Sequence, residues 1–344
     1  MEQGHETERT SRSDSSPKST GRNKQDLIER IRESADKLEK DGSSRGDLKL
    51  LSRTLRELRY AFKVFSPYRR QYKVTVFGSA RTPATDPAYQ TAVQFGQAMA
   101  EHNWFVLTGA ASGIMEAGHV GAGRDHSMGL NIMLPFEQDA NPIIDGDPKL
   151  VHMKYFFTRK LMFVKECHAV VCLPGGFGTL DEALEVLTLL QTGKRDLVPV
   201  VLLDAPGGNY WKRFHEFVIG ELLDGGMISP EDLSLYLLTD DCGEAVNDVI
   251  RFYDVYHSMR YVKDSLVFRL KKKPAEALLD AINETYREIL VDGQFVLGSS
   301  LSEERDEPEL EELPRLIFKF DRRSHGTLRQ MINTLNRGAL EPTA

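Results

Sequence analysis

Residues 169–194 read AVVCLPGGFGTLDEALEVLTLLQTGK and hold three consecutive structural signals. The apolar, β-branched run at 169–173 predicts a short buried strand. The glycine-rich turn PGGFGT follows it, and the apolar spacing after the turn predicts a helix. A strand that passes through a tight turn into a helix is the repeating unit of a parallel sheet covered by helices. This stretch therefore predicts an α/β fold.

The same alternation of short apolar runs and longer helical stretches extends from Tyr72 to about residue 260. The run VPVVLL is apolar at almost every position, as in strands that are buried on both faces of a parallel sheet. We therefore expect a Rossmann-like, doubly wound parallel sheet at 69–260. Its predicted strands lie at 72–77, 104–107, 129–134, 169–173, 198–203 and 235–239.

Two segments precede this domain. Residues 1–23 contain no Phe, Ile, Leu or Val, and we expect them to be a disordered tail because they cannot bury enough surface to offset their ordering entropy. Residues 24–68 show apolar residues at helical spacing on both sides of the sequence DGSS. They predict an arm of two helices.

A third region, 261–344, contains a weak internal repeat with an offset of 50 residues. LVFRLKKKPAEALLDAIN from Leu266 aligns with LIFKFDRRSHGTLRQMIN from Leu316 with five identities in 18, a level that chance could also give. Each copy predicts one strand followed by one helix, so we expect a small α+β extension built as a βα repeat. The acidic stretch SEERDEPELEELP between the copies is expected to be a solvated linker.

Composition argues against several classes of protein. Lys and Arg number 44 against 51 Asp and Glu, and this acidic balance disfavours a general nucleic-acid binder. The three cysteines and the histidines lie at no metal-ligand or disulfide spacing, so we expect no metal and a reducing, cytoplasmic compartment. The longest apolar stretch, 197–203, is far shorter than the roughly 20 residues that a membrane helix needs. The polar start MEQGHETERT has no signal-peptide core.

Glycines follow several of the predicted strands. In an open parallel sheet, ligands bind beyond the carboxyl ends of the strands. Exposed backbone N–H groups and the start of the next helix suit an anion such as phosphate. For any single turn, a plain strand-to-helix connection explains the glycines equally well. The turns are GSAR after the first strand, TGAASG after the second, PFEQ after the third and PGGFGT after the fourth.

Two charged residues stand out beside these turns. The stretch MKYFFTRKLMFVKE before the fourth strand is mostly apolar, so its helix should be largely buried together with Arg159. Burying Arg159 is costly without an anionic partner, which could be a protein carboxylate or a bound ligand. Asp181 after the glycine turn is explained by the helix dipole, but Glu182 is explained less well because it stands beside a presumed anion site.

PGGFGTLDE together with FFTRK resembles the LOG family, the cytokinin riboside 5′-monophosphate phosphoribohydrolases long described as lysine decarboxylases. The resemblance is strongest to the bacterial Rossmann-fold branch, the nucleotide 5′-monophosphate nucleosidases. It extends over VFGSAR, GIMEAG, GLNIMLPFEQ, RKLMFVK and LTLLQTGK, roughly residues 72–260.

The resemblance implies that 69–260 is a nucleotide-binding catalytic domain. It implies hydrolysis of a nucleoside 5′-monophosphate, of the AMP or cytokinin riboside monophosphate type, to free base and ribose 5-phosphate. It further implies that no cofactor takes part and that the protein is a homodimer or higher homo-oligomer. The family's catalytic residues fall on Arg159 and Glu182, and its substrate contacts fall on Gly78, Ser79, Gly109, Gly113, Lys160, Gly175, Gly176, Gly178, Thr179 and Thr188.

One loop departs from the family pattern, because Ala110 and Ala111 stand where glycines are usual. Each methyl group restricts positive φ angles and close backbone approach, which puts the substrate contacts of this loop in question.

The alternative function is a non-catalytic carrier of a nucleotide or of molybdenum cofactor, whose loops look alike. The pair Arg159 and Glu182 favours an enzyme, because a carrier has little use for a carboxylate beside an anion. A lysine decarboxylase is disfavoured because no lysine stands in a recognisable pyridoxal phosphate context. GSARTP lacks the dinucleotide fingerprint, which disfavours an NAD dehydrogenase. Neither a membrane nor a nucleic acid is an expected partner.

Overall fold

The computed structural model describes residues 24–134 and 139–338. The predicted tail at 1–23 and the PFEQ turn after the third predicted strand lie outside the described residues. The chain forms two compact units, residues 1–55 and residues 56–344.

The first unit contains helix α1 (Lys24–Lys40) and the start of helix α2 (Arg45–Phe65). Within the described part of this unit, α1 buries none of its residues. Ser44 and Asp47 exchange two hydrogen bonds at the start of α2. The Asp47 backbone N–H donates to Ser44 Oγ (3.2 Å), and the Ser44 backbone N–H donates to Asp47 Oδ2 (2.9 Å). This is a capping box, and it satisfies N–H groups that the first helical turn leaves free.

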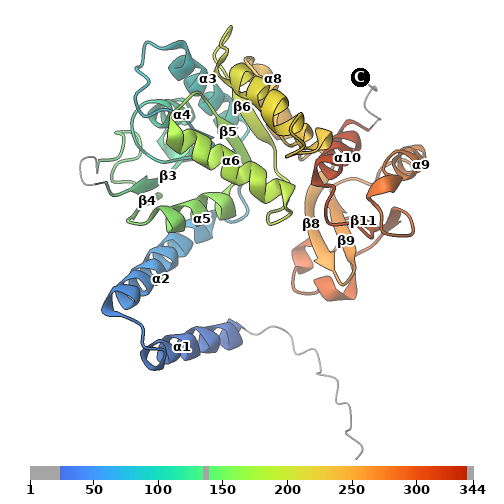
Figure 1. The fold of residues 1–344 in the computed structure, drawn as a ribbon, viewed down its shortest axis with the longest axis horizontal. Coiled ribbons are helices and arrows are strands. Elements are labelled where there is room, and N and C mark those ends of the chain that lie inside the picture. The colour runs from blue at the N-terminus through green and yellow to red at the C-terminus, as the bar shows by residue number, and fades with distance from the viewer. Residues whose placement is uncertain (1–23, 135–138, 339–344) are drawn as a thin grey trace, which may run out of the picture. The chain divides into compact units, whose positions relative to one another are not determined.

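The second unit is built on a seven-stranded sheet with the order β4-β3-β2-β1-β5-β6-β7 (Figure 1). Every pairing between neighbouring strands is parallel, which confirms the predicted Rossmann-like sheet. The strands are β1 (Lys73–Phe77), β2 (Phe105–Thr108), β3 (Ser127–Ile132), β4 (Leu150–Met153), β5 (Ala169–Cys172), β6 (Val200–Leu203) and β7 (Leu237–Thr239).

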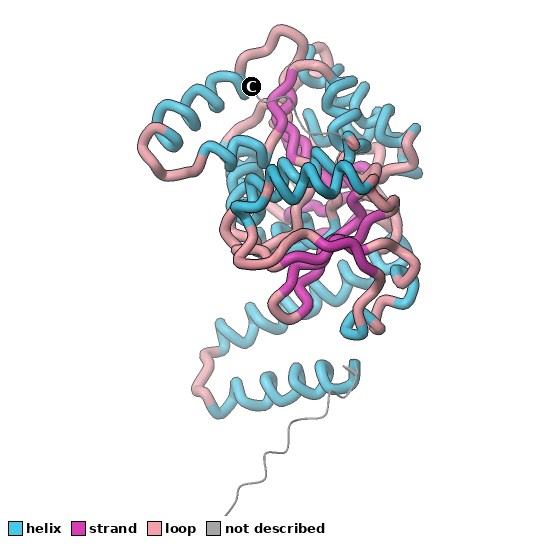
Figure 2. Tube along the Cα trace, turned by 90° about the vertical axis from the view of Figure 1, so that its right-hand side faces the viewer, coloured by secondary structure: helices cyan, strands magenta, loops and turns pink. Residues whose placement is uncertain are grey.

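Helices connect these strands and lie on both sides of the sheet (Figure 2). The chain moves outward from β1 in one direction through β2 and β3, and from β5 in the other direction through β6 and β7. Right-handed crossovers therefore place the two sets of helices on opposite faces. The helices are α3 (Pro87–Glu101), α4 (Ile114–Ala122), α5 (Phe156–Glu166), α6 (Phe177–Gln191), α7 (Tyr210–Phe217) and α8 (Cys242–Arg251). None of the described helices is both long enough and apolar enough to cross a bilayer.

The strand order reverses between β1 and β5, which are direct neighbours. At such a switch point the loops after the two strands diverge to opposite faces and leave a crevice. Strand β4 is an edge strand that the sequence analysis did not predict. It is only four residues long, and its polar residue His152 is exposed. A short run of this kind carries too weak a pattern to be recognised.

The C-terminal part contains an antiparallel sheet with the order β10-β11-β9-β8. Each copy of the repeat is a strand followed by a helix, as predicted. Val267 pairs with Ile317, while Leu266 pairs with Phe318 and Phe268 with Leu316, so equivalent residues exchange partners about a local twofold axis. The elements are β8 (Tyr256–Val262), β9 (Ser265–Leu270), α9 (Glu276–Thr285), β10 (Val296–Gly298), β11 (Arg315–Phe318) and α10 (His325–Arg337).

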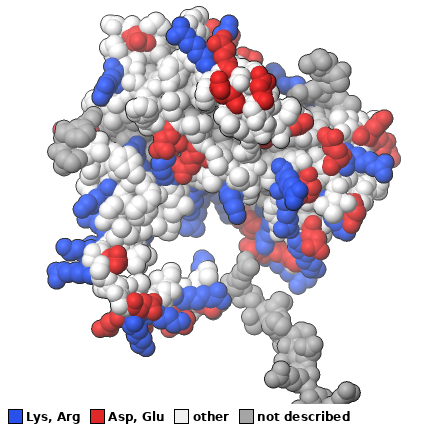
Figure 3. Space-filling model, viewed as in Figure 1, with Lys and Arg blue, Asp and Glu red and all other residues white. Residues whose placement is uncertain are grey.

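Most of the acidic stretch between the two copies is exposed, as expected of a solvated linker, but Glu304 is not. Glu304 is 3% exposed and accepts hydrogen bonds from Nε of Arg269 (2.8 Å) and Nε of Arg315 (3.0 Å). Glu307 also contacts Arg269. The expectation was wrong for Glu304 because two buried arginines on neighbouring strands need carboxylate partners, which sequence distance conceals. On the face drawn in Figure 3, basic and acidic side chains lie intermixed.

A buried histidine joins the last turn of α4 to the ends of two strands. His119 Nε2 donates to the carbonyl oxygen of Met128 (3.0 Å), and Nδ1 accepts from Nδ2 of Asn141 (3.1 Å). Thr108 Oγ1 lies 3.1 Å from Nε2. Burial lowers the pKa of His119 to about 4, so the ring is neutral at pH 7.

We predict that His119 makes the protein less stable in mild acid. The unfolded chain binds a proton at this residue below about pH 6.5, whereas the folded chain stays neutral until about pH 4. The stabilisation is therefore complete above pH 6.5 and is lost as the pH falls, by about 1.4 kcal/mol per pH unit. Urea unfolding of the wild type and of His119→Gln between pH 7 and pH 5 measures this effect. The difference in unfolding free energy between them should narrow with falling pH, and a constant difference would contradict the assignment.

Candidate functional site

A cavity of about 530 Å³ opens at the carboxyl ends of β1, β2 and β5. This is the crevice that the switch point between β1 and β5 leaves. Eight of the residues predicted for the site line it, namely Gly78, Ser79, Gly109, Arg159, Gly176, Gly178, Thr179 and Glu182.

The backbone holds three glycine-containing loops together. The Ser79 N–H donates to the Pro174 carbonyl (3.1 Å), which joins the loop after β1 to the loop after β5. The Ile114 N–H donates to the Ser79 carbonyl (3.0 Å), which joins the loop after β2 to the loop after β1. One wall of the cavity is therefore a hydrogen-bonded unit of main chain.

Gly113 and Gly175 do not line the cavity but allow these loops to approach. Gly113 has φ +64°, and a Cβ there would lie 2.3 Å from the Ser79 carbonyl oxygen. A Cβ on Gly175 would lie 2.1 Å from Thr179 Oγ1. Both glycines are required by close contact within the protein, whatever they do for a ligand.

Helix α6 begins at Phe177, so its N-terminus faces the cavity. The free N–H groups and the dipole at the start of a helix favour a negatively charged group. No Cβ placed on Gly176 or Gly178 would meet another described atom within 4 Å, so this stretch of main chain is open on its cavity side. The geometry fits a phosphate that binds to the backbone.

Arg159 enters the cavity from α5. Its guanidinium packs against the second loop, since a Cβ on Gly109 would lie 2.4 Å from Nη2, and it stacks over the ring of Phe163 (5.2 Å to the centroid). Its Nε is buried and has no hydrogen-bond partner among the described residues. Burial lowers the pKa of Arg159, and the charge of Glu182 opposes this shift. A desolvated donor in this position can bind an anion strongly.

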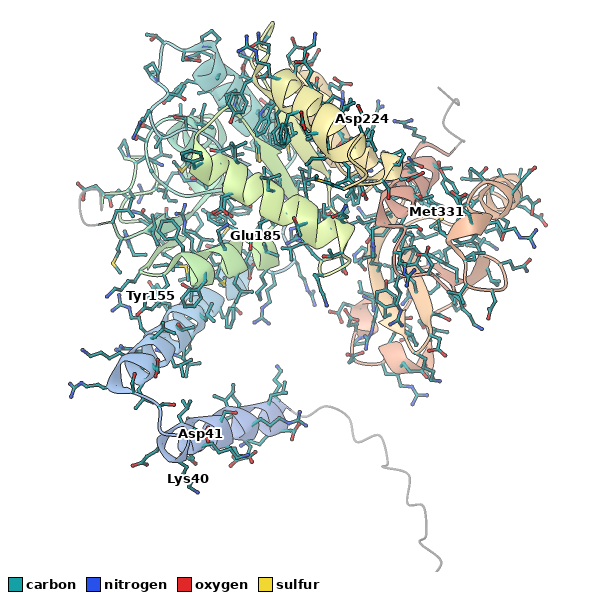
Figure 4. The ribbon with its side chains drawn as sticks, viewed as in Figure 1. Lys40, Asp41, Tyr155, Glu185, Asp224 and Met331 are labelled. Carbon is teal, nitrogen blue, oxygen red and sulfur yellow. The ribbon has the colours of Figure 1, made fainter. Side chains whose placement is uncertain are left out.

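Glu182 faces the same cavity from α6 and is buried. Burial raises the pKa of its carboxyl group, while Lys160 and Arg159 oppose the shift. Lys160 Nζ lies 3.5 Å from Glu182 Oε2 and 2.8 Å from carboxylate oxygens of both Asp181 and Glu185. Figure 4 labels Glu185 on α6 and Tyr155 just before α5, the two helices that this cluster joins.

Lys160 and Thr188, both predicted substrate contacts, are not among the described residues that line the cavity. Burial disfavours the charge of Lys160, but its ion pairs with Asp181 and Glu185 outweigh this and raise its pKa. Thr188 is exposed on α6, and its hydroxyl donates to the Leu184 carbonyl (2.8 Å).

The alanines of the second loop do not prevent a left-handed backbone. Ala110 has φ +60° and is fully buried. Its methyl group packs with Ile144 and Leu150, and its N–H donates to Thr108 Oγ1 (2.9 Å). Burial of the methyl group and this hydrogen bond offset the strain that a positive φ costs an alanine.

Several cavity residues were missed by sequence reasoning. Asn131 is a buried polar residue within the apolar run of β3, and that interruption was the signal that could have revealed it. Phe156 and Asp139 carry no such signal, because loops and helix packing bring them to the cavity. The additional lining residues are Phe77, Ala80, Arg81, Ala111, Met115, Asn131, Ile132, Leu134, Asp139, Phe156, Phe177 and Asp181. No group of three or more His, Cys, Asp or Glu side chains within 24–134 and 139–338 could hold a metal ion.

Comparison with known proteins adds independent findings. The family model described as "Possible lysine decarboxylase" matches residues 108–249. The chain is 36% identical over 152 residues to cytokinin riboside 5′-monophosphate phosphoribohydrolase LOG7 of Arabidopsis thaliana, an alignment that covers 42% of this chain and 65% of LOG7. It thus spans slightly less than two thirds of that relative.

Two further similarities were found. LOG3 of Arabidopsis thaliana, a phosphoribohydrolase of the same description, is 32% identical over 172 residues, which cover 48% of this chain and 74% of LOG3. Among solved structures, the molybdenum cofactor carrier protein MCP from Chlamydomonas reinhardtii is 22% identical with a TM-score of 0.38, covering 53% of this chain and 98% of that one. The family model and the extent of the match to LOG3 show that this chain belongs to the LOG family.

Proposed function

We propose that this chain hydrolyses the N-glycosidic bond of nucleoside 5′-monophosphates and releases a free base and ribose 5-phosphate. The observation that carries the proposal is the position of Arg159 and Glu182 in one cavity beside the N-terminus of α6. Membership of the LOG family supports it, because the relatives LOG7 and LOG3 carry the name of this activity.

Glu182 suits the charge that develops on the sugar. Breaking the bond between C1 and the base builds positive charge on C1 and the ring oxygen, and water then adds to C1 and loses a proton. A buried carboxylate on a fixed helix stabilises this positive charge and can orient the attacking water. Burial raises the pKa of this carboxyl group, which favours its taking the proton that the attacking water loses.

The α6 N-terminus and Arg159 suit the two negative groups of the substrate. The 5′-phosphate would bind the main chain at Gly176 to Thr179, and this remote binding would align the bond that breaks. Arg159 has two possible roles: its fork can bind the phosphate, or it can stabilise the negative charge on the departing base.

The competing functions use the same cavity differently. A carrier of a nucleotide or of molybdenum cofactor would bind its ligand without breaking a bond, and Glu182 beside the anion site would weaken that binding. A pyridoxal phosphate decarboxylase needs a lysine for its Schiff base, and the described residues lining the cavity include none.

Assembly as a homodimer is also part of the proposal. Phe157 and Leu161 on α5 and Leu184 on α6 are 49%, 49% and 44% exposed. An apolar face of this kind favours association with a second copy. Thr188 lies one turn beyond Leu184 on the same helix. In a homodimer, Thr188 could therefore contact a substrate that is bound to the second copy.

The free thiols of Cys167, Cys172 and Cys242 favour the reducing cytoplasm as the compartment of this protein.

Replacing the carboxylate should abolish most of the activity. We expect Glu182→Ala to lower kcat for release of adenine from AMP by roughly 100- to 1,000-fold, as when one stabilising group is removed from an active site. Chromatographic separation of adenine from AMP measures it, with Leu180→Val, a conservative change two residues before Glu182, as the control. Adenine release by Glu182→Ala at the wild-type rate would end this assignment.

The phosphate should be essential for efficient turnover. Adenosine lacks the group that we place at the α6 N-terminus, so its kcat/KM should be at least about 100-fold below that of AMP. Parallel assays over a panel of nucleoside monophosphates and their nucleosides measure this ratio. Equal rates for AMP and adenosine would remove the phosphate from the mechanism, and nucleotide binding without release of base would favour a carrier.

A charge on the apolar face should weaken assembly. We expect Leu161→Glu to reduce the mass measured by light scattering to that of one 38.9 kDa chain, because burying an unpaired carboxylate in an interface is costly. Lys212→Glu on α7 is the control. A wild-type chain that is monomeric at micromolar concentration would contradict the homodimer.

A further inference from the structure

Helix α2 begins in the N-terminal unit, but its residues 56–65 belong to the second unit and lie outside the part of the chain that resembles the family. Glu57, Ala61 and Phe65 follow one another at intervals of four and form its buried face. Ala61 and Phe65 are 0% and 1% exposed and belong to the main hydrophobic core. This part of α2 is therefore fixed to the second unit by packing.

Glu57 is the one charged member of that face, at 6% exposure. Its Oε1 accepts a hydrogen bond from the Lys154 backbone N–H (3.0 Å), and its Oε2 accepts from Thr158 Oγ1 (2.9 Å). Both donors belong to the start of α5, whose N-cap residue Tyr155 makes no side-chain cap among the described residues. A carboxylate about 100 positions away thus anchors the start of this helix through the backbone before its N-cap and a side chain of its first turn, a contact that we call the Glu57 cap.

A carboxylate is a costly residue for a packing contact, because burial disfavours its charge. Here it stabilises the positive end of the α5 dipole and binds two donors at once. Two bonds to residues four apart fix both the rotation of the helix and its position along its axis. A second contact lies farther along the same two helices, where Lys165 Nζ sits 5.3 Å from the ring of Phe62.

The next residue after Thr158 is Arg159. The guanidinium of Arg159 fits closely against Gly109. Its Nε has no hydrogen-bond partner among the described residues, so no hydrogen bond at Nε fixes the side chain. Its position in the cavity therefore depends on the placement of α5. We infer that Glu57 is a positioning residue of the site, through which the N-terminal arm helix places Arg159 for the nucleotide. This inference rests on the proposed function.

The test is a double-mutant cycle on the full chain with AMP. Glu57→Ala should lower kcat/KM roughly 10- to 100-fold, as expected when a catalytic group is misplaced by about 1 Å. Glu57→Gln keeps one acceptor oxygen and should recover part of the loss. Arg159→Ala should leave a low residual turnover, which radiolabelled AMP can measure. Replacing Glu57 in this variant should lower the residual turnover less than about twofold, because the Arg159 side chain that Glu57 positions is already absent.

Ala61→Gly is the matched control, because it weakens the same helix interface one turn away without touching the cap. It should lower the melting temperature while kcat/KM stays unchanged. Two results would overturn the inference and leave Glu57 a purely structural residue. One is a loss of kcat/KM in Ala61→Gly equal to that in Glu57→Ala. The other is that Glu57→Ala lowers kcat/KM by the same factor whether or not Arg159 is present.

Hydrogen exchange separates this inference from the proposed function. The Lys154 amide loses its acceptor in Glu57→Ala and should exchange about tenfold faster, while amides in the middle of α6 keep their rates. If the wild-type chain releases no base from any nucleotide, the proposed function fails, and the exchange of Lys154 still tests the cap. An unchanged rate at Lys154 would show that Glu57 does not hold α5.

Discussion

Two opposite charges, the half-buried Arg159 and the buried Glu182, lie on separate helices at one edge of a parallel sheet. The contacts described for Glu182 include an ion pair with Lys160 rather than with Arg159, and the Arg159 Nε remains without a partner among the described residues. Holding buried charges in this way costs free energy. An anionic group bound at Arg159 would recover part of that cost, and the positive charge that develops on the sugar as the bond breaks would recover the rest at Glu182.

The surroundings of the cavity serve to maintain this arrangement. Main-chain hydrogen bonds join the loops after β1, β2 and β5, and Lys160 is held between three carboxylates of α6. Glu57 caps α5 from a helix outside the family resemblance. Residues that do not line the cavity thus determine where the lining residues lie, which explains why Gly113 and Gly175 stand in the motifs without facing the cavity.

The local motifs carried most of the information about the fold and the cavity. The strand, turn and helix at 169–194 required a parallel sheet, and the order of the glycine turns placed them at one edge. Arg159 and Glu182 were found because each stands in a short, contiguous motif. Asp139 and Phe156 were not found, since they reach the cavity through loops and helix packing. Glu304 was assigned to solvent, because its arginine partners stand 11 and 35 residues away.

The sequence by itself determined the parallel sheet, the glycine turns at one edge of it, and the choice of Arg159 and Glu182 as site residues. Hydrophobic periodicity, turn residues and motif spacing carry this information because each depends on only a few neighbouring residues. Tertiary structure alone decided that Lys160 pairs with carboxylates and does not line the cavity, that Ala110 takes a left-handed conformation, and that Glu57 caps α5. These outcomes depend on which distant groups share a buried space. Desolvation and hydrogen bonding there are set by three-dimensional neighbours, which no local pattern specifies.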